Sequence, residues 1–469
     1  MSPCERFSTE RFNTVKDLEA ALDKIVKSYD IRGIVPEQLN VELAARFGVA
    51  FARFWKEKDP AVTQVLCGRD MRKSGEELSQ AFIAQVAGQG LDIVDLGLIS
   101  TDMLYFASGW LDAPGVIFTA SHNPAAYNGI KACHRQAVPI GMGTGLERAK
   151  ELAAGVAPEV SGHIASGKIL KANLLEEFVA HAHSFVDMSN LKPLKVVVDC
   201  ANGMGGLVAP AVLEDLPFVM DFLYPELDGT FPNHPADPLD ASNLADLQKR
   251  VGQLGADVGI AFDGDGDRVF FVDEQATALS GSIALSILAT SVLARNPGAT
   301  VLYSAVCSRA VPEIVTELGG NAICTRVGHS HIKKQMAETQ ATFAGEHSGH
   351  FYFADNYRAD SGIIATLVLL EHMCITGQPL SQLREASQRY VASGEHNVSV
   401  ADTSEVLEHL AEIYSSYPQE HIDGLSVDAG SWWFNVRPSN TEPLLRINLE
   451  SATDCAGRLE ELCEQIAKL

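Results

Sequence analysis

Three stretches of the chain share one pattern of hydrophobic and polar positions. Each begins with a short run of β-branched and aliphatic residues, breaks into a loop of glycine, aspartate or serine, and continues at helical spacing. The stretches are VTQVLCGRDMRKS at 62–74, LKVVVDCANGMGG at 194–206 and ATVLYSAVCSRAV at 299–311. This alternation is typical of α/β domains with buried strands. The sequence therefore predicts three comparable α/β units.

The helix after the first loop has the clearest start and stop signals. Ser74 and Glu77 have the spacing of a capping box, and Gly88 marks the expected end. The apolar residues expected on its buried face are Leu78, Phe82 and Val86. We therefore expect a helix over about 75–88 that packs against the first sheet.

The last part of the chain has a different pattern. A polar stretch, SGEHNVSVADTS, is followed by the helical segment SEVLEHLAEIY and by the strand-like runs WWFNV and LLRINLE. This order predicts a smaller α+β domain. A length of 469 residues suits three or four domains. The boundaries expected from these patterns are 1–166, 167–276, 277–386 and 387–469.

The charge balance narrows the classes of partner. Lys and Arg number 36 against 60 Asp and Glu, a formal net charge of -24. Such an acidic chain repels phosphate backbones and anionic membrane surfaces, so we expect no nucleic-acid or membrane partner. If the substrate is anionic, arginines and lysines must be concentrated where it binds.

Cysteine usage and the chain start indicate a cytoplasmic protein. Nine cysteines are scattered without CxxC pairs, which argues against a disulfide framework or a zinc ribbon. The beginning, MSPCERFSTERF, does not have the pattern of a signal peptide, and the longest apolar run, near SIALSILATSVLA, is too short to span a bilayer.

The strongest chemical signal is GIAFDGDGDRVFFVD. Asp263, Asp265 and Asp267 alternate with Gly264 and Gly266 between two strand-like runs. Three carboxylates so close repel one another, and the glycines allow the backbone to bring their oxygens together around a divalent cation. Oxygen ligands without His or Cys favour Mg²⁺.

This loop has two other interpretations. Glu274 falls at the twelfth position from Asp263, as in an EF-hand, but Arg268 stands where the EF-hand needs glycine. Strands rather than helices are also expected on both sides. The remaining alternative is a solvated acidic turn without a metal.

The stretch TASHNP places Ser121 between a strand-like run and a loop. Taken alone, this serine is most simply a helix cap or a turn residue. It does not fit the GxSxG elbow of hydrolases, because Thr119 and Asn123 occupy the glycine positions. The continuation YNGIK adds Lys131, and a serine combined with a Mg²⁺ site suggests phosphoryl transfer.

Two later loops have compositions suited to a sugar phosphate. GEHSGH at 345–350 combines a carboxylate, a hydroxyl and two imidazoles, a set suited to hydrogen bonding with sugar hydroxyls. RPSNTEP at 437–443 places Arg437 among hydroxyl and amide groups, and Arg446 follows on the next strand-like run. An arginine fork among such donors is typical of a phosphate cradle, although an ordinary turn with a surface arginine remains open. YDIRG at 29–33 and RVGHSHIK at 326–333 supply further donors.

With YDIRG, TASHNP, DGDGDR, GEHSGH and RPSNTEP in this order, the chain resembles the α-D-phosphohexomutase family over nearly its whole length. It looks most like bacterial members of the actinobacterial type. The resemblance implies four domains around a central cleft, three similar α/β domains and a C-terminal domain of the TATA-box-protein-like class. It also implies an isomerase that interconverts mannose 6-phosphate and mannose 1-phosphate through a phosphoserine and a hexose 1,6-bisphosphate. Phosphoglucomutase or dual specificity is the alternative, and a metal-dependent sugar phosphatase is less favoured.

The resemblance also assigns roles. Ser121 is the expected phosphoserine and, with Asp263, Asp265 and Asp267, a Mg²⁺ ligand. The residues expected near the reacting groups are Lys131, His350 and Arg32. Those expected to bind substrate are Tyr29, His122, Arg268, Gly328, His329, Glu346, Ser348, Arg437, Ser439, Asn440, Thr441 and Arg446.

Two departures from the family pattern concern the substrate. Many relatives have D-x-K where this chain has Ser304, Ala305 and Val306, so a lysine that contacts substrate is missing. His347 replaces a methionine common in dual-specificity members. The expected partners are a hexose phosphate substrate and a catalytic hexose 1,6-bisphosphate as activator, with the protein a monomer or weak homodimer.

Overall fold

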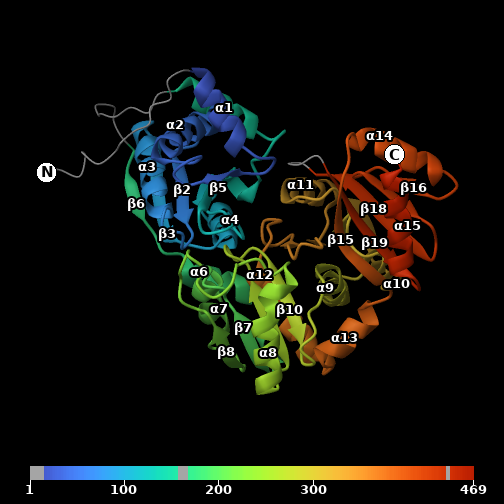
Figure 1. The fold of residues 1–469 in the computed structure, drawn as a ribbon. Helices are drawn as coiled ribbons and strands as arrows, with labels where there is room; N and C mark the ends of the chain where they lie inside the picture. The colour runs from blue at the N-terminus through green and yellow to red at the C-terminus, as the bar shows by residue number, and fades with distance from the viewer. Residues whose placement is uncertain (1–14, 157–166, 440–443, 469) are drawn as a thin grey trace.

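The computed structural model describes residues 15–156, 167–439 and 444–468. Four sheets follow one another along the chain, each with its own helices (Figure 1). Three are mixed sheets and the last is antiparallel. The prediction of three similar α/β domains followed by a smaller α+β domain is confirmed.

The first sheet has six strands in the order β1-β5-β4-β2-β3-β6. Strands β2, β3, β4 and β6 run parallel, whereas β5 is antiparallel to β4 and to β1. In sheet order the bounds are β1 Ile31–Ile34, β5 Tyr127–Cys133, β4 Gly115–Phe118, β2 Gln64–Arg69, β3 Asp92–Leu98 and β6 Ile169–Lys171. The associated helices are α1 Val15–Ile25, α2 Val41–Lys58, α3 Gly75–Gly88, α4 Thr101–Trp110 and α5 Leu146–Gly155.

The second and third sheets repeat the centre of the first. Their orders are β10-β9-β7-β8 and β12-β11-β13-β14, and each ends in an antiparallel pair, β9 with β10 and β13 with β14. The strand bounds are β7 Lys195–Asp199, β8 Val219–Leu223, β9 Val258–Phe262, β10 Val269–Asp273, β11 Thr300–Ser304, β12 Asn321–Thr325, β13 Phe343–Gly345 and β14 Phe351–Phe353. The helices are α6 Leu175–His183, α7 Gly205–Leu213, α8 Ala245–Leu254, α9 Gly281–Arg295, α10 Ala310–Glu317, α11 His329–Thr339, α12 Gly362–Thr376 and α13 Leu380–Ser387.

The fourth sheet has the order β15-β19-β18-β17-β16. The strands are β15 Val391–Ser399, β16 Gln419–Glu420, β17 Leu425–Asp428, β18 Trp432–Pro438 and β19 Leu444–Ser451, and the helices are α14 Thr403–Ile413 and α15 Cys455–Ala467. Both strand-like runs and the helix expected in this region are therefore present.

The apolar core explains how the units are joined. One continuous cluster of buried residues includes Leu104 of the first unit, Phe262 of the second and Phe343 of the third. The fourth unit has a separate cluster around Phe434 and Leu462. Burial of apolar surface thus ties the first three units together, whereas the fourth meets them through a different kind of contact.

One local prediction is wrong. The helix over 75–88 forms and its apolar face is buried, but Ser74 makes no capping bond with its side chain. The backbone of Ser74 is already helical, and its Oγ accepts a hydrogen bond at 2.9 Å from the Nδ2 of Asn128 on β5. A tertiary contact has taken the hydroxyl that a capping box would use.

Two further features bear on expectations from composition. Every cysteine that the structure describes is a free thiol. Among the described residues, no single helix has the length and apolar character needed to cross a membrane. Helices α12 and α13 together reach that length and composition, with a bend of 99° between them.

Candidate active site

Three loops from three different sheets meet at the site. Residues 119–126 connect β4 to β5, residues 263–268 connect β9 to β10, and residues 346–350 connect β13 to β14. These are equivalent hairpins, because each joins a parallel strand to the antiparallel strand beside it. The motifs TASHNP, DGDGDR and EHSGH therefore occupy the same place in three similar units.

Ser121 lies at the point where the first and second loops touch. It is 3% exposed, and its Oγ donates a hydrogen bond of 2.7 Å to Oδ2 of Asp263. Its backbone is left-handed, with φ of 50°, a conformation that costs energy for a residue other than glycine. The fold therefore holds this serine in a strained turn with its hydroxyl directed at the aspartate loop.

Arg72, which the sequence did not single out, holds that turn. Its guanidinium donates to the carbonyl oxygens of Ser121, Asn123, Pro124 and Tyr127 at 2.6 to 2.9 Å. The side chain is 1% exposed and also pairs with the carboxylate of Asp70 at 3.2 Å. Its only signal in the sequence is an arginine two residues after an aspartate in the loop GRDMRKS.

The three aspartates of the second loop converge as predicted. One carboxylate oxygen from each of Asp263, Asp265 and Asp267 lies within 4.8 Å of the others, and all three residues are buried. Gly264 makes the approach to the first loop possible, since a Cβ there would lie 2.3 Å from the carbonyl oxygen of Ser121. Oδ1 of Asp265 and Oδ1 of Asp267 are buried without a hydrogen-bond partner.

Lys131 faces this cluster from the middle of β5. Its Nζ donates to Oδ2 of Asp265 at 2.7 Å and to Oδ2 of Asp267 at 2.6 Å. Burial opposes the charge on this ammonium, but the two carboxylates raise the pKa of Lys131 well above its usual value. The lysine is therefore a fixed cation bound to two of the three aspartates.

The carboxylates differ in their readiness to ionise. Burial raises the pKa of Asp263 to about 7, although Arg268 opposes the shift through a bond of 2.9 Å from its Nε. Burial also acts on Asp267, but Lys131 and His350 hold the pKa of its carboxyl well below the usual range. A site that raises the pKa of one carboxyl group and lowers the pKa of its neighbour is typical of a functional centre.

The first residue of α4 donates two hydrogen bonds to Asp265. Thr101 donates to this aspartate twice, from Oγ1 to Oδ2 at 2.6 Å and from its backbone N–H to the carbonyl oxygen at 2.9 Å. The next residue, Asp102, accepts a bond of 2.6 Å from Ser361, the residue that caps α12. Helix α4 thus connects the second and third units to the first.

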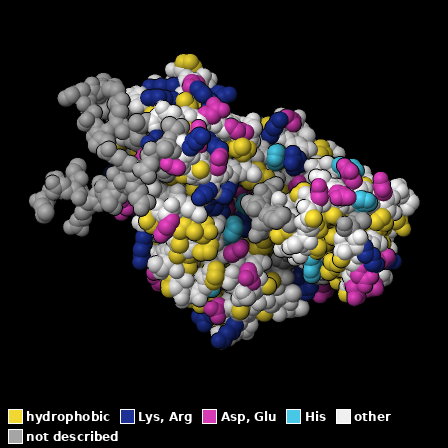
Figure 2. Space-filling view, turned by 45° about the horizontal axis from the view of Figure 1, so that its top comes forward, with side chains coloured by type: hydrophobic (Ala, Val, Ile, Leu, Met, Phe, Trp, Pro, Cys, Tyr) yellow, Lys and Arg dark blue, Asp and Glu magenta, His cyan; other side chains and the backbone are white. Residues whose placement is uncertain are grey.

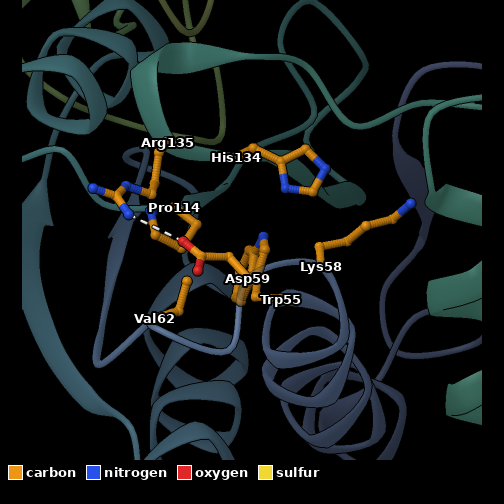
Figure 3. Close-up of a pocket in the computed structure, with 7 residues that line it drawn as sticks. All are labelled: Trp55, Lys58, Asp59, Val62, Pro114, His134 and Arg135. Atoms are coloured by element: carbon orange, nitrogen blue, oxygen red, sulfur yellow. Dashed lines mark hydrogen bonds and ion pairs between the residues drawn. The ribbon is translucent and has the colours of Figure 1, made fainter.

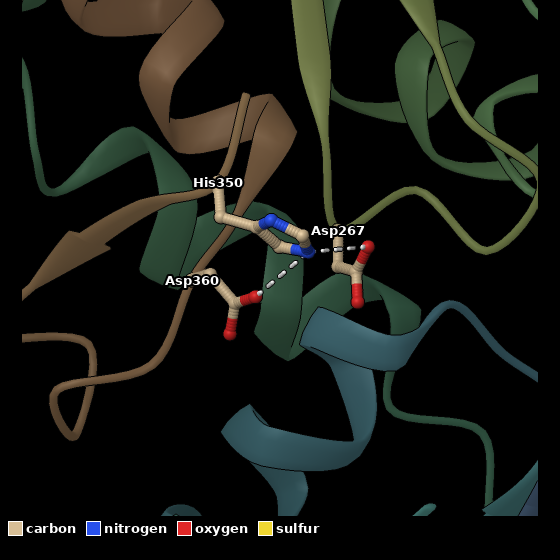
Figure 4. Close-up of side chains that lie close together, drawn as sticks. All are labelled: Asp267, His350 and Asp360. Atoms are coloured by element: carbon tan, nitrogen blue, oxygen red, sulfur yellow. Dashed lines mark ion pairs between the residues drawn. The ribbon is translucent and has the colours of Figure 1, made fainter. Parts of the chain in front are cut away.

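The third loop brings His350 to the aspartates. Its Nε2 lies 3.6 Å from Oδ1 of Asp267 and 3.9 Å from Oδ2 of Asp360, and Figure 4 shows the ring pointing between the two carboxylates. Burial lowers the pKa of His350, but Asp267, Asp360 and Glu346 outweigh it and raise the pKa overall. Nδ1 lies 2.9 Å from Oγ of Ser348.

Both carboxylate oxygens of Glu346 accept hydrogen bonds. Oε1 accepts from the backbone N–H of Gly328 at 2.9 Å, and Oε2 accepts from the hydroxyl of Tyr352 at 2.7 Å. Gly328 has φ of 116°, and a Cβ on it would meet the ring of Tyr29. The ring of Tyr29 in turn lies 5.4 Å from that of His329. These residues, predicted from separate motifs, form one group.

The remaining predicted cations of the first two units lie close to Ser121. Arg32 hydrogen-bonds Asp30 and the side chain of Asn123, and Nη2 of Arg268 lies 3.5 Å from the serine Oγ. His122 is adjacent, with Nδ1 at 3.3 Å from that oxygen. Burial, followed by Arg268, Arg32 and Lys131, lowers the pKa of His122 far below its usual value, so its ring is neutral.

The fourth unit places Arg437 and Arg446 side by side. They are directly opposite each other in the register of β18 and β19, and both pair with Glu395. A contact with the third unit is made by Asp423, which accepts from the N–H of Val327 at 3.1 Å. Ser439 is described, whereas Asn440 and Thr441 lie outside the described residues.

The sequence did not reveal a buried pair beside His350. Lys333 on α11 is 3% exposed, lies over the ring of Tyr105 at 3.4 Å, and faces Oδ1 of Asp360 at 3.5 Å. Burial lowers the pKa of this lysine. The sequence singled out Lys333 only as the last residue of RVGHSHIK, because its contact with the ring of Tyr105 joins the third unit to the first.

Another pocket, of about 170 Å³, lies in the first unit away from these groups. Figure 3 shows its lining, in which Arg135 pairs with Asp59. Pro114 of this pocket precedes β4, whereas Ser121 follows the same strand, so the two features lie toward opposite ends of β4. The space-filling view shows a hollow near the middle of one face, with basic, acidic and histidine side chains around it (Figure 2).

Comparison with known proteins identifies related domains in order along the chain. Models of the four phosphoglucomutase/phosphomannomutase domains match in order: alpha/beta/alpha domain I at 23–149, domain II at 176–277, domain III at 280–390 and the C-terminal domain at 395–469.

Individual relatives match over nearly their whole length. "Phosphohexose mutases" of Xanthomonas campestris is 38% identical, over 94% of this chain and 98% of the relative. "Phosphomannomutase" of Escherichia coli is 36% identical, over 91% and 95%. A crystal structure of a phosphoglucomutase/phosphomannomutase family protein from Burkholderia thailandensis superimposes with a TM-score of 0.85 at 29% identity, over 95% and 97% of the two chains.

Proposed function

The chain belongs to the phosphoglucomutase/phosphomannomutase family, and from that premise we propose that it is a phosphomannomutase, an isomerase that interconverts mannose 6-phosphate and mannose 1-phosphate. The observation that carries the proposal is the bond of 2.7 Å between Oγ of Ser121 and Asp263, which joins a buried hydroxyl to a carboxylate cluster. A hydroxyl in that position suits a carrier that receives and returns a phosphoryl group.

The reaction has two halves. A hydroxyl of the hexose phosphate attacks the phosphorus of phospho-Ser121, the bond from phosphorus to Oγ breaks, and a hexose 1,6-bisphosphate forms. The bisphosphate then turns over in the site, and Oγ attacks the phosphorus of its other phosphate. The bond from that phosphorus to the sugar oxygen breaks, the sugar oxygen takes up a proton, and the isomeric hexose phosphate leaves while phospho-Ser121 is regenerated. Positioning and charge neutralisation must supply most of the acceleration, because phosphate esters react very slowly unaided.

The residues present fit a Mg²⁺ ion. Asp263, Asp265 and Asp267 offer oxygen atoms only, and two of these carboxylates each have a buried oxygen without a partner. We propose that they hold the ion together with Ser121. When bound, Mg²⁺ would offset the negative charge that builds up on the transferring group.

Two residues would neutralise charge and transfer protons during the reaction. Because the pKa of Lys131 is raised well above its usual value, this residue keeps its proton and suits the neutralisation of phosphoryl charge. The pKa of His350 is raised from a value near neutrality, so its ring can both donate and accept a proton at the reacting hydroxyl. Arg32 and Arg268 would contact the transferring phosphoryl group.

The remaining groups would bind the substrate. Glu346 and Ser348 would hydrogen-bond the sugar hydroxyls, with Tyr29, His122, Gly328 and His329 around them. The phosphate that is not transferred would lie against the fourth unit. Its proposed ligands are Arg437, Ser439, Asn440, Thr441 and Arg446.

We extend the proposal to the setting of the enzyme. A hexose 1,6-bisphosphate would act as activator by phosphorylating Ser121, and a hexose phosphate would be the partner the site requires. We further propose that the enzyme is cytoplasmic and is a monomer or a weak homodimer.

A direct assay tests the reaction. Mannose 1-phosphate supplied with a trace of the bisphosphate should be converted to mannose 6-phosphate without release of inorganic phosphate. Net phosphate release would indicate a phosphatase instead. A higher kcat/KM for glucose 1-phosphate than for mannose 1-phosphate would contradict the mannose preference but leave the mechanism standing.

The carrier is tested separately. Ser121→Ala should lower turnover by more than about a thousandfold, and intact-mass analysis should no longer find an added phosphoryl group. Ser184→Ala, which removes a hydroxyl bonded to a helical carbonyl elsewhere, is the matched control and should keep both properties. Full activity of the first variant would rule out Ser121 as the carrier.

A further inference from the structure

The two arginines of the fourth unit form a cross-strand pair. Arg437 on β18 and Arg446 on β19 are direct cross-strand partners, so their guanidinium groups extend from the same face of the sheet. Like charges placed directly opposite each other destabilise a sheet unless an anion lies between them. The described structure supplies such an anion from the protein itself.

Glu395 occupies that position. Its Oε2 lies 3.1 Å from Nη2 of Arg437, and its Oε1 lies 2.9 Å from Nη1 of Arg446. One carboxylate thus spans two guanidinium groups, one oxygen for each. This is also how two oxygens of a phosphate would be shared between them.

An irregularity in the backbone directs Glu395 to this place. The pairing of β15 with β19 shifts register between Ala392 and Glu395, and Gly394 within the shift has φ of 75°. A bulge of this kind turns the next side chain to a new direction and is common beside active sites. The bridge is therefore specified by the strand itself rather than by a chance surface contact.

We infer that Glu395 is an internal competitor for the phosphate cradle, a carboxylate that offsets part of the positive charge of Arg437 and Arg446 and lowers their affinity for a sugar phosphate. The inference rests on the proposed function, in which these arginines hold the phosphate that is not transferred. When phosphate enters, the carboxylate must move aside or remain as a nearby like charge. Either outcome lowers the affinity for phosphate.

A weakened cradle suits the proposed reaction. The bisphosphate must leave the arginines between the two half reactions, turn over, and return with its other phosphate in the same place. Tight binding shared equally by every species would lower KM without helping that exchange. Glu395 would keep the side chains of the two arginines ordered and would also speed the dissociation of phosphate from them.

Binding of inorganic phosphate to the whole enzyme tests this inference without relying on turnover. In Glu395→Gln the side chain keeps its size but loses its charge, and titration calorimetry at fixed ionic strength should show a Kd for phosphate lower by about tenfold. Glu408→Gln removes the same charge from the exposed face of α14 and should leave the Kd unchanged. If Glu395→Gln does not fold, Glu395→Ala should shift the Kd in the same direction.

The opposite result has a clear meaning. An unchanged or higher Kd in both Glu395 variants would overturn the inference, because the carboxylate would then merely orient the arginines. Arg437→Gln separates this outcome from failure of the proposed cradle. Weaker phosphate binding in that variant would support the proposed role of Arg437 in holding phosphate. An unchanged Kd would contradict both that role and the role inferred for Glu395.

Steady-state kinetics provide an independent readout. Glu395→Gln should lower KM for mannose 1-phosphate and also lower kcat, because the bisphosphate would leave the arginines more slowly. Inorganic phosphate should inhibit the variant about tenfold more strongly. A higher KM with unchanged kcat would contradict the inference, because it would mark Glu395 as a residue that supports binding.

Discussion

Ser121 and Asp263 belong to different units of the fold, yet the hydroxyl of one donates to the carboxylate of the other at 2.7 Å. Their approach depends on Gly264, where a Cβ would lie 2.3 Å from the serine carbonyl oxygen. The geometry of the proposed site is therefore set by how closely two loops can pack.

Gly264→Ala should separate these loops. Displacement by about 1 Å is enough to lower turnover by about a hundredfold, since the reacting groups lose their alignment. Gly252→Ala is the control, because an added Cβ there meets nothing within 4 Å and the residue lies in α8. Steady-state assays of both variants check the prediction, and equal activity would show that the loops tolerate the extra methyl group.

Removal of Mg²⁺ should stop turnover. Three buried carboxylates within 4.8 Å of one another repel each other, and phosphorylation of Ser121 would add further negative charge. Chelation should abolish activity and added Mg²⁺ should restore it. In addition, Mg²⁺ should raise the Tm of the native protein but not that of Asp265→Asn. A Tm that responds equally in the two proteins would place the ion elsewhere.

Arg72 should matter for both stability and activity. Arg72→Met would leave Asp70 buried without its ion-pair partner and would remove the guanidinium that donates to four carbonyl oxygens, which should lower the free energy of unfolding by about 3 kcal/mol. Turnover should fall as the serine turn relaxes. Arg69→Met, whose longer ion pair of 3.8 Å is partly exposed, should change stability by less than about 1 kcal/mol. Thermal unfolding monitored by circular dichroism distinguishes the two.

Asp102 should make stability depend on pH. Burial raises its pKa to about 7, although Ser100 and Ser361 oppose the shift. A folded state that holds the proton more tightly than the unfolded chain gains stability at acid pH and loses it as pH rises through 7. A shift of about three units sets an upper limit of about 4 kcal/mol.

Asp102→Asn imitates the protonated side chain and should flatten this dependence. Tm measured from pH 5 to 8 should fall less steeply for the variant than for the native protein. Parallel curves would show that Asp102 does not titrate in this range. Asp92→Asn, a more exposed aspartate on β3, is the control and should follow the native curve.

Most of the architecture could be predicted from the sequence, because strands and helices depend largely on local patterns of apolar and polar residues. Strands β2, β7 and β11 form where the apolar runs predicted them, and the aspartate loop lies between two strands as expected. The sequence predicted that glycines in this loop let the carboxylates converge, but it did not show that Gly264 also lets the carbonyl oxygen of Ser121 approach.

The features that could not be predicted from the sequence depend on contacts between residues far apart in the chain. Arg72 bonds with carbonyl oxygens about 50 residues away in the chain, and Lys333 meets a ring on another unit. Ser74 gave its hydroxyl to Asn128 instead of to its own helix. Glu395 stood in a polar stretch with no visible partner until the register of three strands brought the arginines beside it.

The equivalence of the three hairpins has a practical consequence for experiments on fragments. A separately expressed first unit would contain the serine but neither the aspartates nor His350, and each of the other two would be incomplete in a complementary way. Mixed fragments should regain turnover only to the extent that they reassociate. Enzyme activity in this protein is thus a measure of assembly between units, and a small molecule that loosens a junction would act as an inhibitor without entering the site.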